Sequence, residues 1–176
     1  FNPAVVSPAQ AYGLMQVTPD AGRYVCKRAG ISFDLNRMKT DSVYNAMLGA
    51  AELGGLLEDY RGSYILTFAG YNAGRGRVKD WIARFGDPRD PKVDPIDWVE
   101  QIPFSETRED VKRLLHMILS HQGKKEYSAP VEPEFEEAFA LYFIDELDSK
   151  LNAISRIRNK PENQGRPFSD WVQLLG

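Results

Sequence analysis

Few residues in this chain could do chemistry by themselves, and their spacing excludes several kinds of site. His116 and His121 have no Cys, Asp or Glu at metal-ligand spacing, so we expect surface or helix-end histidines and no metal ion. Gly74 and Gly76 are too close together for a phosphate-binding loop, and they lack its lysine. The single cysteine, Cys26, cannot form a disulfide within the chain. We therefore expect no cofactor.

The composition indicates a single main domain and excludes a polyanion as the natural partner. With 22 Lys and Arg against 25 Asp and Glu, the net charge is −3, and no long basic run indicates nucleic acid binding. A chain of 176 residues with 43% hydrophobic content can bury one sizeable core. No apolar run approaches the roughly 20 residues of a membrane-spanning helix. A neutral or mixed-charge substrate fits this balance.

Three blocks of residues follow one another along the first two thirds of the chain. Residues 1–16 read F-N-P-A-V-V-S-P-A-Q-A-Y-G-L-M-Q, residues 69–74 read A-G-Y-N-A-G, and residues 97–108 read D-W-V-E-Q-I-P-F-S-E-T-R. Each block alone is weak, since a loop that approaches a helix would explain Gly-Leu-Met-Gln. Together they resemble the family 1 soluble lytic transglycosylases, with F-x-P-x-A-x-S-x-x-G-A-x-G-L-M-Q, A-Y-N-A-G and E-x-I-P-F-x-E-T-R. The resemblance extends to about residue 121.

This resemblance implies an all-α, lysozyme-like fold whose cleft binds peptidoglycan glycan strands. The implied reaction cleaves the β-1,4 bond between N-acetylmuramic acid and N-acetylglucosamine and leaves a 1,6-anhydromuramic acid end. It is a lyase reaction that consumes no water. The implied location is the bacterial periplasm or cell envelope. The alternative is a non-catalytic peptidoglycan-binding or scaffolding module of a cell-envelope assembly.

The family's catalytic group is a single glutamate, which acts first as an acid on the glycosidic oxygen and then as a base on the muramoyl 6-hydroxyl. In the family pattern E-S-x-F it would stand three residues before Phe1, outside the printed sequence. Three explanations stay open. The sequence begins after the glutamate of a longer protein, the domain is degenerate, or another carboxylate such as Glu52, Glu100 or Glu106 replaces it.

The resemblance also assigns supporting residues. Tyr71 matches a tyrosine whose hydroxyl lies beside the catalytic carboxyl, and the substrate-binding candidates are Ser7, Gln16, Asn72 and Glu106. Structural alternatives remain for three of them. Ser7 could be a turn residue, Asn72 a backbone cap, and Glu106 a first-turn acid that complements the helix dipole.

Two positions depart from the family pattern. Asp110 stands where the family commonly has a tyrosine that lines the site, and a short charged side chain cannot stack on a sugar ring. We therefore expect a change in substrate affinity or activity. Gln10 replaces a common glycine, with smaller consequences.

Helical periodicity dominates the chain, so the expected fold class is all-α. Caps and apolar spacing predict helices over residues 19–29, 41–60, 63–70, 77–85 and 105–121, one turn over 97–101, a turn-rich stretch at 71–76 and a loop at 86–95. The predicted buried face of the second helix consists of Val43, Ala46, Met47, Ala50, Leu53, Leu57 and Tyr60. Trp81 and Trp98 could stack on sugar rings, but apolar anchoring of short helices is the commoner use of tryptophan and is the expected one.

The domain prediction has three parts: residues 1–122 as a transglycosylase domain lacking its N-terminal end, 123–133 as a linker, and 134–176 as a helical extension. The extension contains one long helix with acidic residues at its start and basic residues at its end, followed by a short helix near residues 168–175. Its apolar face consists of Phe135, Phe139, Phe143, Leu147, Leu151, Ile154 and Ile157. This face either packs on the domain or docks a protein partner.

Overall fold

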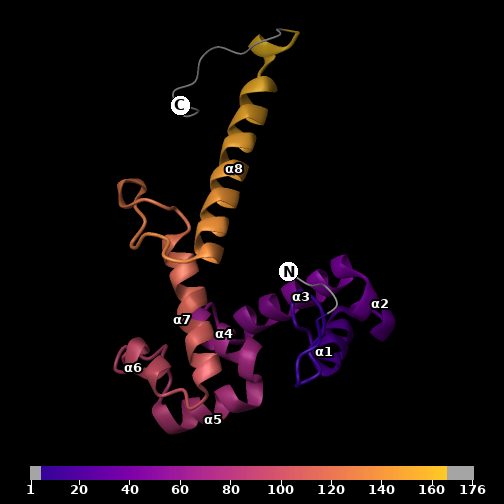
Figure 1. The fold of residues 1–176 in the computed structure, drawn as a ribbon, viewed down its shortest axis with the longest axis vertical. Coiled ribbons are helices and arrows are strands. Elements are labelled where there is room, and N and C mark those ends of the chain that lie inside the picture. The colour runs from indigo at the N-terminus through magenta and orange to yellow at the C-terminus, as the bar shows by residue number, and fades with distance from the viewer. Residues whose placement is uncertain (1–4, 166–176) are drawn as a thin grey trace. The chain divides into compact units, whose positions relative to one another are not determined.

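The computed structural model describes residues 5–165, and every regular element in that range is helical (Figure 1). The α-helices are α1 Pro19–Ala29, α2 Leu35–Thr40, α3 Ser42–Asp59, α4 Tyr64–Ala73, α5 Arg75–Phe85, α6 Pro95–Glu100, α7 Ser105–Ser120 and α8 Glu136–Arg158. Single 3-10 turns lie at Lys125–Tyr127 and Pro161–Asn163. The predicted all-α class is confirmed. None of the described helices combines the length and the apolar character that a membrane-spanning helix requires.

Side-chain caps set the starts of the first helices. Thr18 accepts a 3.3 Å hydrogen bond from the Ala21 backbone N–H and begins α1, while Asp41 accepts from Val43 and Tyr44 at 3.0 Å and begins α3. Helix α2 was not predicted. Its N-cap, Asp34, accepts from the Arg37 N–H at 2.9 Å, but its six residues are too few to show apolar periodicity.

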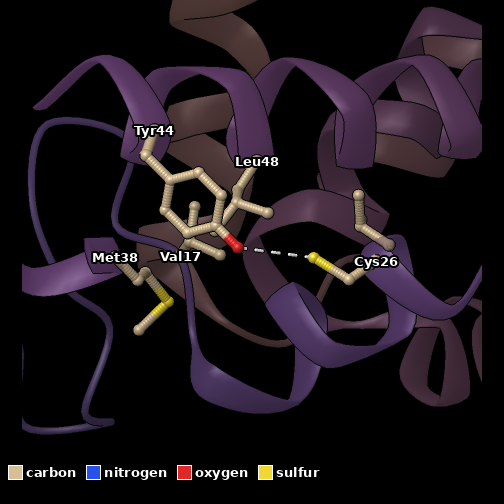
Figure 2. Close-up of a cluster of buried hydrophobic side chains, with 6 residues drawn as sticks. Val17, Cys26, Met38, Tyr44 and Leu48 are labelled. Atoms are coloured by element: carbon tan, nitrogen blue, oxygen red, sulfur yellow. Dashed lines mark hydrogen bonds between the residues drawn. The ribbon is translucent and has the colours of Figure 1, made fainter. Parts of the chain in front are cut away.

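The chain divides into two compact units, Phe1–Val111 and Lys112–Gly176. In the first unit, α1, α2 and α3 enclose a core of Val17, Val25, Cys26, Met38, Tyr44 and Leu48. Figure 2 shows the Tyr44 hydroxyl within this cluster, 3.6 Å from the Cys26 Sγ. Burial raises the pKa of the Tyr44 hydroxyl. This core holds the residues before α1 against the first turns of α3.

The buried face of α3 differs from the predicted one. Val43 and Met47 are 71% and 64% exposed, and Ala50 is also exposed. The buried residues are Tyr44, Asn45, Leu48, Gly49, Glu52 and Leu56. The prediction was wrong because it counted apolar side chains only, whereas Asn45 and Glu52 are buried through hydrogen bonds and an ion pair.

Helix α4 also extends beyond its prediction, since Tyr71, Asn72 and Ala73 form its last turn. Residues 71–73 were predicted to belong to a turn, but they are helical. The glycine before them, Gly70, does not end the helix, because it allows close packing against neighbouring side chains. A Cβ on Gly70 would lie 3.0 Å from side-chain atoms of Leu56 and Tyr60. The break comes at Gly74, where φ is +86° and α5 follows directly.

The predicted aromatic anchors are confirmed. Trp98 is fully buried and Trp81 nearly so, and their rings meet edge-to-face at 6.4 Å. The Trp98 Nε1–H donates to the carbonyl oxygen of Gly86 at 2.9 Å, which ties the predicted 86–95 loop to α6. Phe104 adds a third ring, 5.8 Å from Trp81, directly before α7.

The second unit contains the end of α7, the segment after it and α8. Within it Ala138 is fully buried, the ring of Tyr142 lies against Gly123, and the rings of His116 and Phe135 are 5.2 Å apart. Beyond Phe135, most of the predicted apolar face of α8 is exposed to solvent, with Phe143 and Leu147 each 58% exposed. The predicted division at residue 122 remains a prediction, and the predicted helix near 168–175 lies outside the described residues.

Candidate functional site

A buried asparagine fixes the conformation of the Gly-Leu-Met-Gln turn. Asn45 Oδ1 accepts from the Met15 N–H at 2.9 Å, while its Nδ2 donates to the carbonyl oxygens of Tyr12 at 2.8 Å and Met38 at 3.2 Å. Gly13 lies over this amide with a φ of +76°, and a Cβ there would be 2.6 Å from Asn45 Cγ. The turn therefore needs a glycine both for its left-handed backbone and for this close contact.

Two predicted substrate contacts, Ser7 and Gln16, also hold the turn region together. Ser7 Oγ accepts from the Ala11 N–H at 3.0 Å, the geometry of a turn residue. Gln16 Nε2 donates to the carbonyl oxygen of Gly13 at 2.8 Å. The Gln16 side chain lines a pocket with α4, whereas Ser7 lines neither of the two pockets described below.

Tyr71 connects α4 to the same turn. Its hydroxyl donates a 2.7 Å hydrogen bond to the carbonyl oxygen of Met15. Burial, together with the nearby negative charge of Glu52, raises the pKa of Tyr71 to about 12. Tyr71 therefore stays protonated at neutral pH and acts as a hydrogen-bond donor.

Glu52 is the buried carboxylate of the site. It projects from α3, is 7% exposed and pairs with the Arg75 guanidinium at the start of α5. Arg75 Nε also lies 3.1 Å from Asp59 Oδ2, so one arginine joins two acids of α3 to α5. The ion pair supplies the compensation that a buried charge requires.

Asn72, in the last turn of α4, contacts two residues of α7. The hydroxyl of Thr107 donates to Asn72 Oδ1 at 2.5 Å, and Asn72 Nδ2 donates to Asp110 Oδ2 at 2.6 Å. These contacts fix which end of the amide is oxygen and which is nitrogen. Asp110, the residue that departs from the family pattern, thus orients Asn72.

Two neighbouring pockets share Asn72 and Ala73. The first has a volume of about 230 Å³ and is lined by Gln16, Val17, Thr18, Ala21, Glu52, Gly70, Tyr71, Asn72, Ala73 and Gly74. The second has a volume of about 450 Å³ and is lined by Asn72, Ala73, Arg77, Pro103, Phe104, Ser105, Glu106 and Thr107. Together they offer amide, hydroxyl, guanidinium and carboxylate groups to one ligand, a combination suited to a polar, extended molecule.

The pockets bring together most of the predicted site residues. Gln16, Tyr71 and Asn72 line the first pocket, and Asn72 and Glu106 line the second. Glu106 is also an acidic residue in the first turn of α7. It can therefore complement the helix dipole and contact a ligand at the same time.

The three carboxylates considered as replacement acids differ in position. Glu52 and Glu106 line one pocket each, whereas Glu100 lies 3.9 Å from Arg108 and lines neither. The oxygens of Glu52 are engaged by Arg75, which favours a structural role for that residue.

Sequence reasoning missed Asn45, Thr107 and Arg77 as parts of the site. Thr107 stands inside the third motif block, so its hydroxyl could have been predicted to bond a neighbouring helix. One feature of the sequence could have indicated the role of Asn45: it is a polar residue beside apolar neighbours on a predicted helix. Such residues are buried only when their amide is satisfied.

Residues 1–93 match the family described as the Transglycosylase SLT domain. The chain is 34% identical over 116 residues to the soluble lytic murein transglycosylase of Escherichia coli strain K12, covering 65% of this chain and 17% of that protein. A putative soluble lytic murein transglycosylase from Haemophilus influenzae is 32% identical over 115 residues, with 65% and 19% covered.

Solved structures give the same assignment. The 70 kDa soluble lytic transglycosylase SLT70 of E. coli matches with a TM-score of 0.56 and 35% identity, over 63% of this chain and 18% of that one. An inactive mutant of the lytic transglycosylase Slt from Pseudomonas aeruginosa matches with a TM-score of 0.53 and 33% identity, over 63% and 17%. The chain thus spans less than a fifth of the length of these relatives.

Proposed function

The chain belongs to the Transglycosylase SLT domain family, and on this premise we propose that its first unit is the glycan-binding part of a peptidoglycan lytic transglycosylase. The observation that supports this proposal most strongly is that residues from separate motif blocks meet at neighbouring pockets. Gln16, Tyr71 and Asn72 come from two motif blocks separated by more than fifty residues and line one pocket, while the third block lines the pocket beside it. The two pockets share Asn72 and Ala73, and neighbouring polar pockets suit an extended sugar chain.

The proposed reaction cleaves the β-1,4 bond after N-acetylmuramic acid without water. A glutamate preceding residue 1 in the longer protein protonates the glycosidic oxygen, and the C1–O4 bond breaks. The resulting carboxylate then takes the proton of the muramoyl 6-hydroxyl, whose oxygen bonds to C1. The nucleophile belongs to the substrate itself, so positioning supplies much of the acceleration.

The residues of this chain would contribute that positioning. Tyr71 holds the Met15 carbonyl and thereby fixes the Gly-Leu-Met-Gln turn at the pocket wall. Asn72 keeps one N–H and one carbonyl lone pair beyond its contacts to Thr107 and Asp110, which matches the acceptor and donor of an acetamido group. Glu106 would accept a sugar hydroxyl in the second pocket.

Asp110 favours a second candidate, a non-catalytic glycan-binding or scaffolding module of a cell-envelope assembly. Its bond to Asn72 replaces a stacking surface by a polar contact. In either case the proposed location is the periplasm or cell envelope, and the proposed partner is the peptidoglycan glycan strand. One solved relative is a complex of the 70 kDa soluble lytic transglycosylase with bulgecin A, so bulgecin A is a suitable probe ligand for this site.

The test is a digest of purified peptidoglycan with the full-length protein that carries this chain. Mass spectrometry is expected to detect 1,6-anhydromuropeptides and no newly formed reducing muramic acid ends. Binding of peptidoglycan without such products would select the module, and reducing ends would indicate a hydrolase. Failure to bind either peptidoglycan or bulgecin A would contradict both candidates.

A further inference from the structure

Helix α8 carries a continuous stripe of large apolar side chains in contact with solvent. The stripe consists of Phe139, Phe143, Ile144, Leu147, Leu151 and Ile154, which are 45–65% exposed. Apart from the adjacent pair Phe143 and Ile144, they recur at three- and four-residue intervals, so they share one side of the 23-residue helix. A contiguous apolar surface of this kind marks an interface rather than ordinary surface composition.

The rest of the second unit does not use this face. Ala138 is fully buried, and Tyr142 packs against Gly123. At 100° per residue, these two residues lie on the side of the helix opposite Leu147 and Leu151. The helix therefore has one face engaged within its own unit and one face without a partner among the described residues.

Acidic residues cluster at the start of α8, and basic residues cluster at its end. Glu134, Glu136 and Glu137 stand at its start, and Arg156, Arg158 and Lys160 at its end. Among the described residues, Glu136, Arg156 and Arg158 have no ion-pair partner, whereas the central Lys150 pairs with Glu146 at 3.1 Å. The segregation complements the dipole of the helix itself, but it also makes two antiparallel copies complementary to each other.

We propose that the apolar stripe of α8 is a homodimer interface in which two copies of α8 pair antiparallel. The apolar stripe of one copy packs on the apolar stripe of the other, and the acidic start of each helix lies beside the basic end of its partner. A parallel pair would bring like charges together at both ends and is disfavoured for that reason. The stripe is little more than two heptads long, so we expect a dimer at the weak end of specific interfaces, with dissociation in the micromolar range.

The first test is sedimentation velocity of the 176-residue chain between about 1 and 300 µM, a range that brackets a micromolar dissociation constant. A concentration-dependent monomer–dimer equilibrium is expected. Leu151→Asp should raise the dissociation constant by about tenfold or more, since it places a charge in the stripe. Its matched control is Ser149→Asp, an exposed position on the opposite face, which should leave the constant unchanged. Circular dichroism of each variant verifies that α8 still folds.

The second test measures the relative direction of the two α8 helices by cross-linking. Glu136→Cys and Arg158→Cys chains are mixed and treated with a flexible bismaleimide, with the natural chain as background because Cys26 is only 1% exposed. The mixed pair should cross-link more than either variant alone. Preferential 136–136 and 158–158 products would overturn the antiparallel arrangement. A chain that stays monomeric throughout this concentration range would overturn the proposal.

Discussion

The hydroxyl of Tyr71 donates a 2.7 Å hydrogen bond to the carbonyl oxygen of Met15, and this bond joins α4 to the turn that carries Gln16, another residue that lines the pocket. Tyr71→Phe removes only this donor. We expect a loss of about 1 kcal/mol in unfolding free energy and weaker binding of bulgecin A. The control is Tyr64→Phe, because Tyr64 is 48% exposed and stacks on Phe68. Equal binding by the two variants would contradict a positioning role for Tyr71.

Tyr71 should also give the protein a specific dependence on alkaline pH. Its folded pKa is about 12, above the ordinary tyrosine value of 10.0, so the folded state favours the protonated phenol. This stabilisation is complete below pH 10 and is lost as the pH rises to about 12, since the unfolded chain ionises first. The difference in stability between the natural chain and Tyr71→Phe should therefore shrink across that window. Urea unfolding at several pH values measures it, and a constant difference would refute the assignment.

Removal of the Glu52 charge should destabilise the first unit. Glu52→Gln leaves the partly buried Arg75 with Asp59 as its remaining acidic partner, and we expect a cost of about 1–3 kcal/mol. Glu58→Gln is the matched control on the same helix, because the side chain of Glu58 is 78% exposed in its pair with Arg28. Thermal unfolding compares the two. Similar melting temperatures would show that the Glu52–Arg75 pair adds nothing to stability.

Asn45→Ala should be among the most damaging substitutions in the site region. It removes the acceptor of the Met15 N–H and the donor to the buried Met38 carbonyl oxygen, while the Tyr12 carbonyl oxygen keeps its bond from the Val17 N–H, at a cost of about 2–4 kcal/mol. The exposed Asn36 provides the control, Asn36→Ala, for which we expect almost no change. Chemical denaturation gives both values. A cost below that of an ordinary surface substitution would mean that the turn does not depend on Asn45.

Asp110→Ala tests how the α7 carboxylate acts on Asn72. The amide of Asn72 would keep its bond from Thr107 and lose the 2.6 Å bond to Asp110, so we expect bulgecin A to bind about three- to tenfold more weakly. Glu109→Ala, the exposed neighbour, is the control. Tighter binding by Asp110→Ala would instead indicate that Asp110 competes with the ligand for Asn72.

The sequence predicted most helices because caps and apolar periodicity are local signals. Thr18, Asp41 and Ser63 each accept a hydrogen bond from a backbone N–H in the first turn of a helix that the sequence predicts. The burial of Asn45 and Glu52 could not be read from periodicity, since their compensation comes from Met15 and Arg75, far away in sequence. Tertiary contacts of this kind decide which face of α3 is buried.

For the candidate site as well, the sequence predicted which residues belong to it but not how they contact one another. The order of the motif blocks indicated Gln16, Tyr71, Asn72 and Glu106 as a set, and the two pockets bring them together. The same motifs could not reveal that Tyr71 bonds a backbone carbonyl, or that Asp110 orients Asn72. Such pairings depend on how α4 meets its neighbours and not on residue type.

The central claim is that the three motif blocks form one glycan-binding surface in the first unit. The most direct measurement is an NMR titration of the 176-residue chain with a short N-acetylglucosamine–N-acetylmuramic acid oligosaccharide. Amide shifts are expected for residues 13–18, 70–74 and 104–107, with none along α8. Absent shifts at these three segments, or shifts confined to a different surface, would contradict the account.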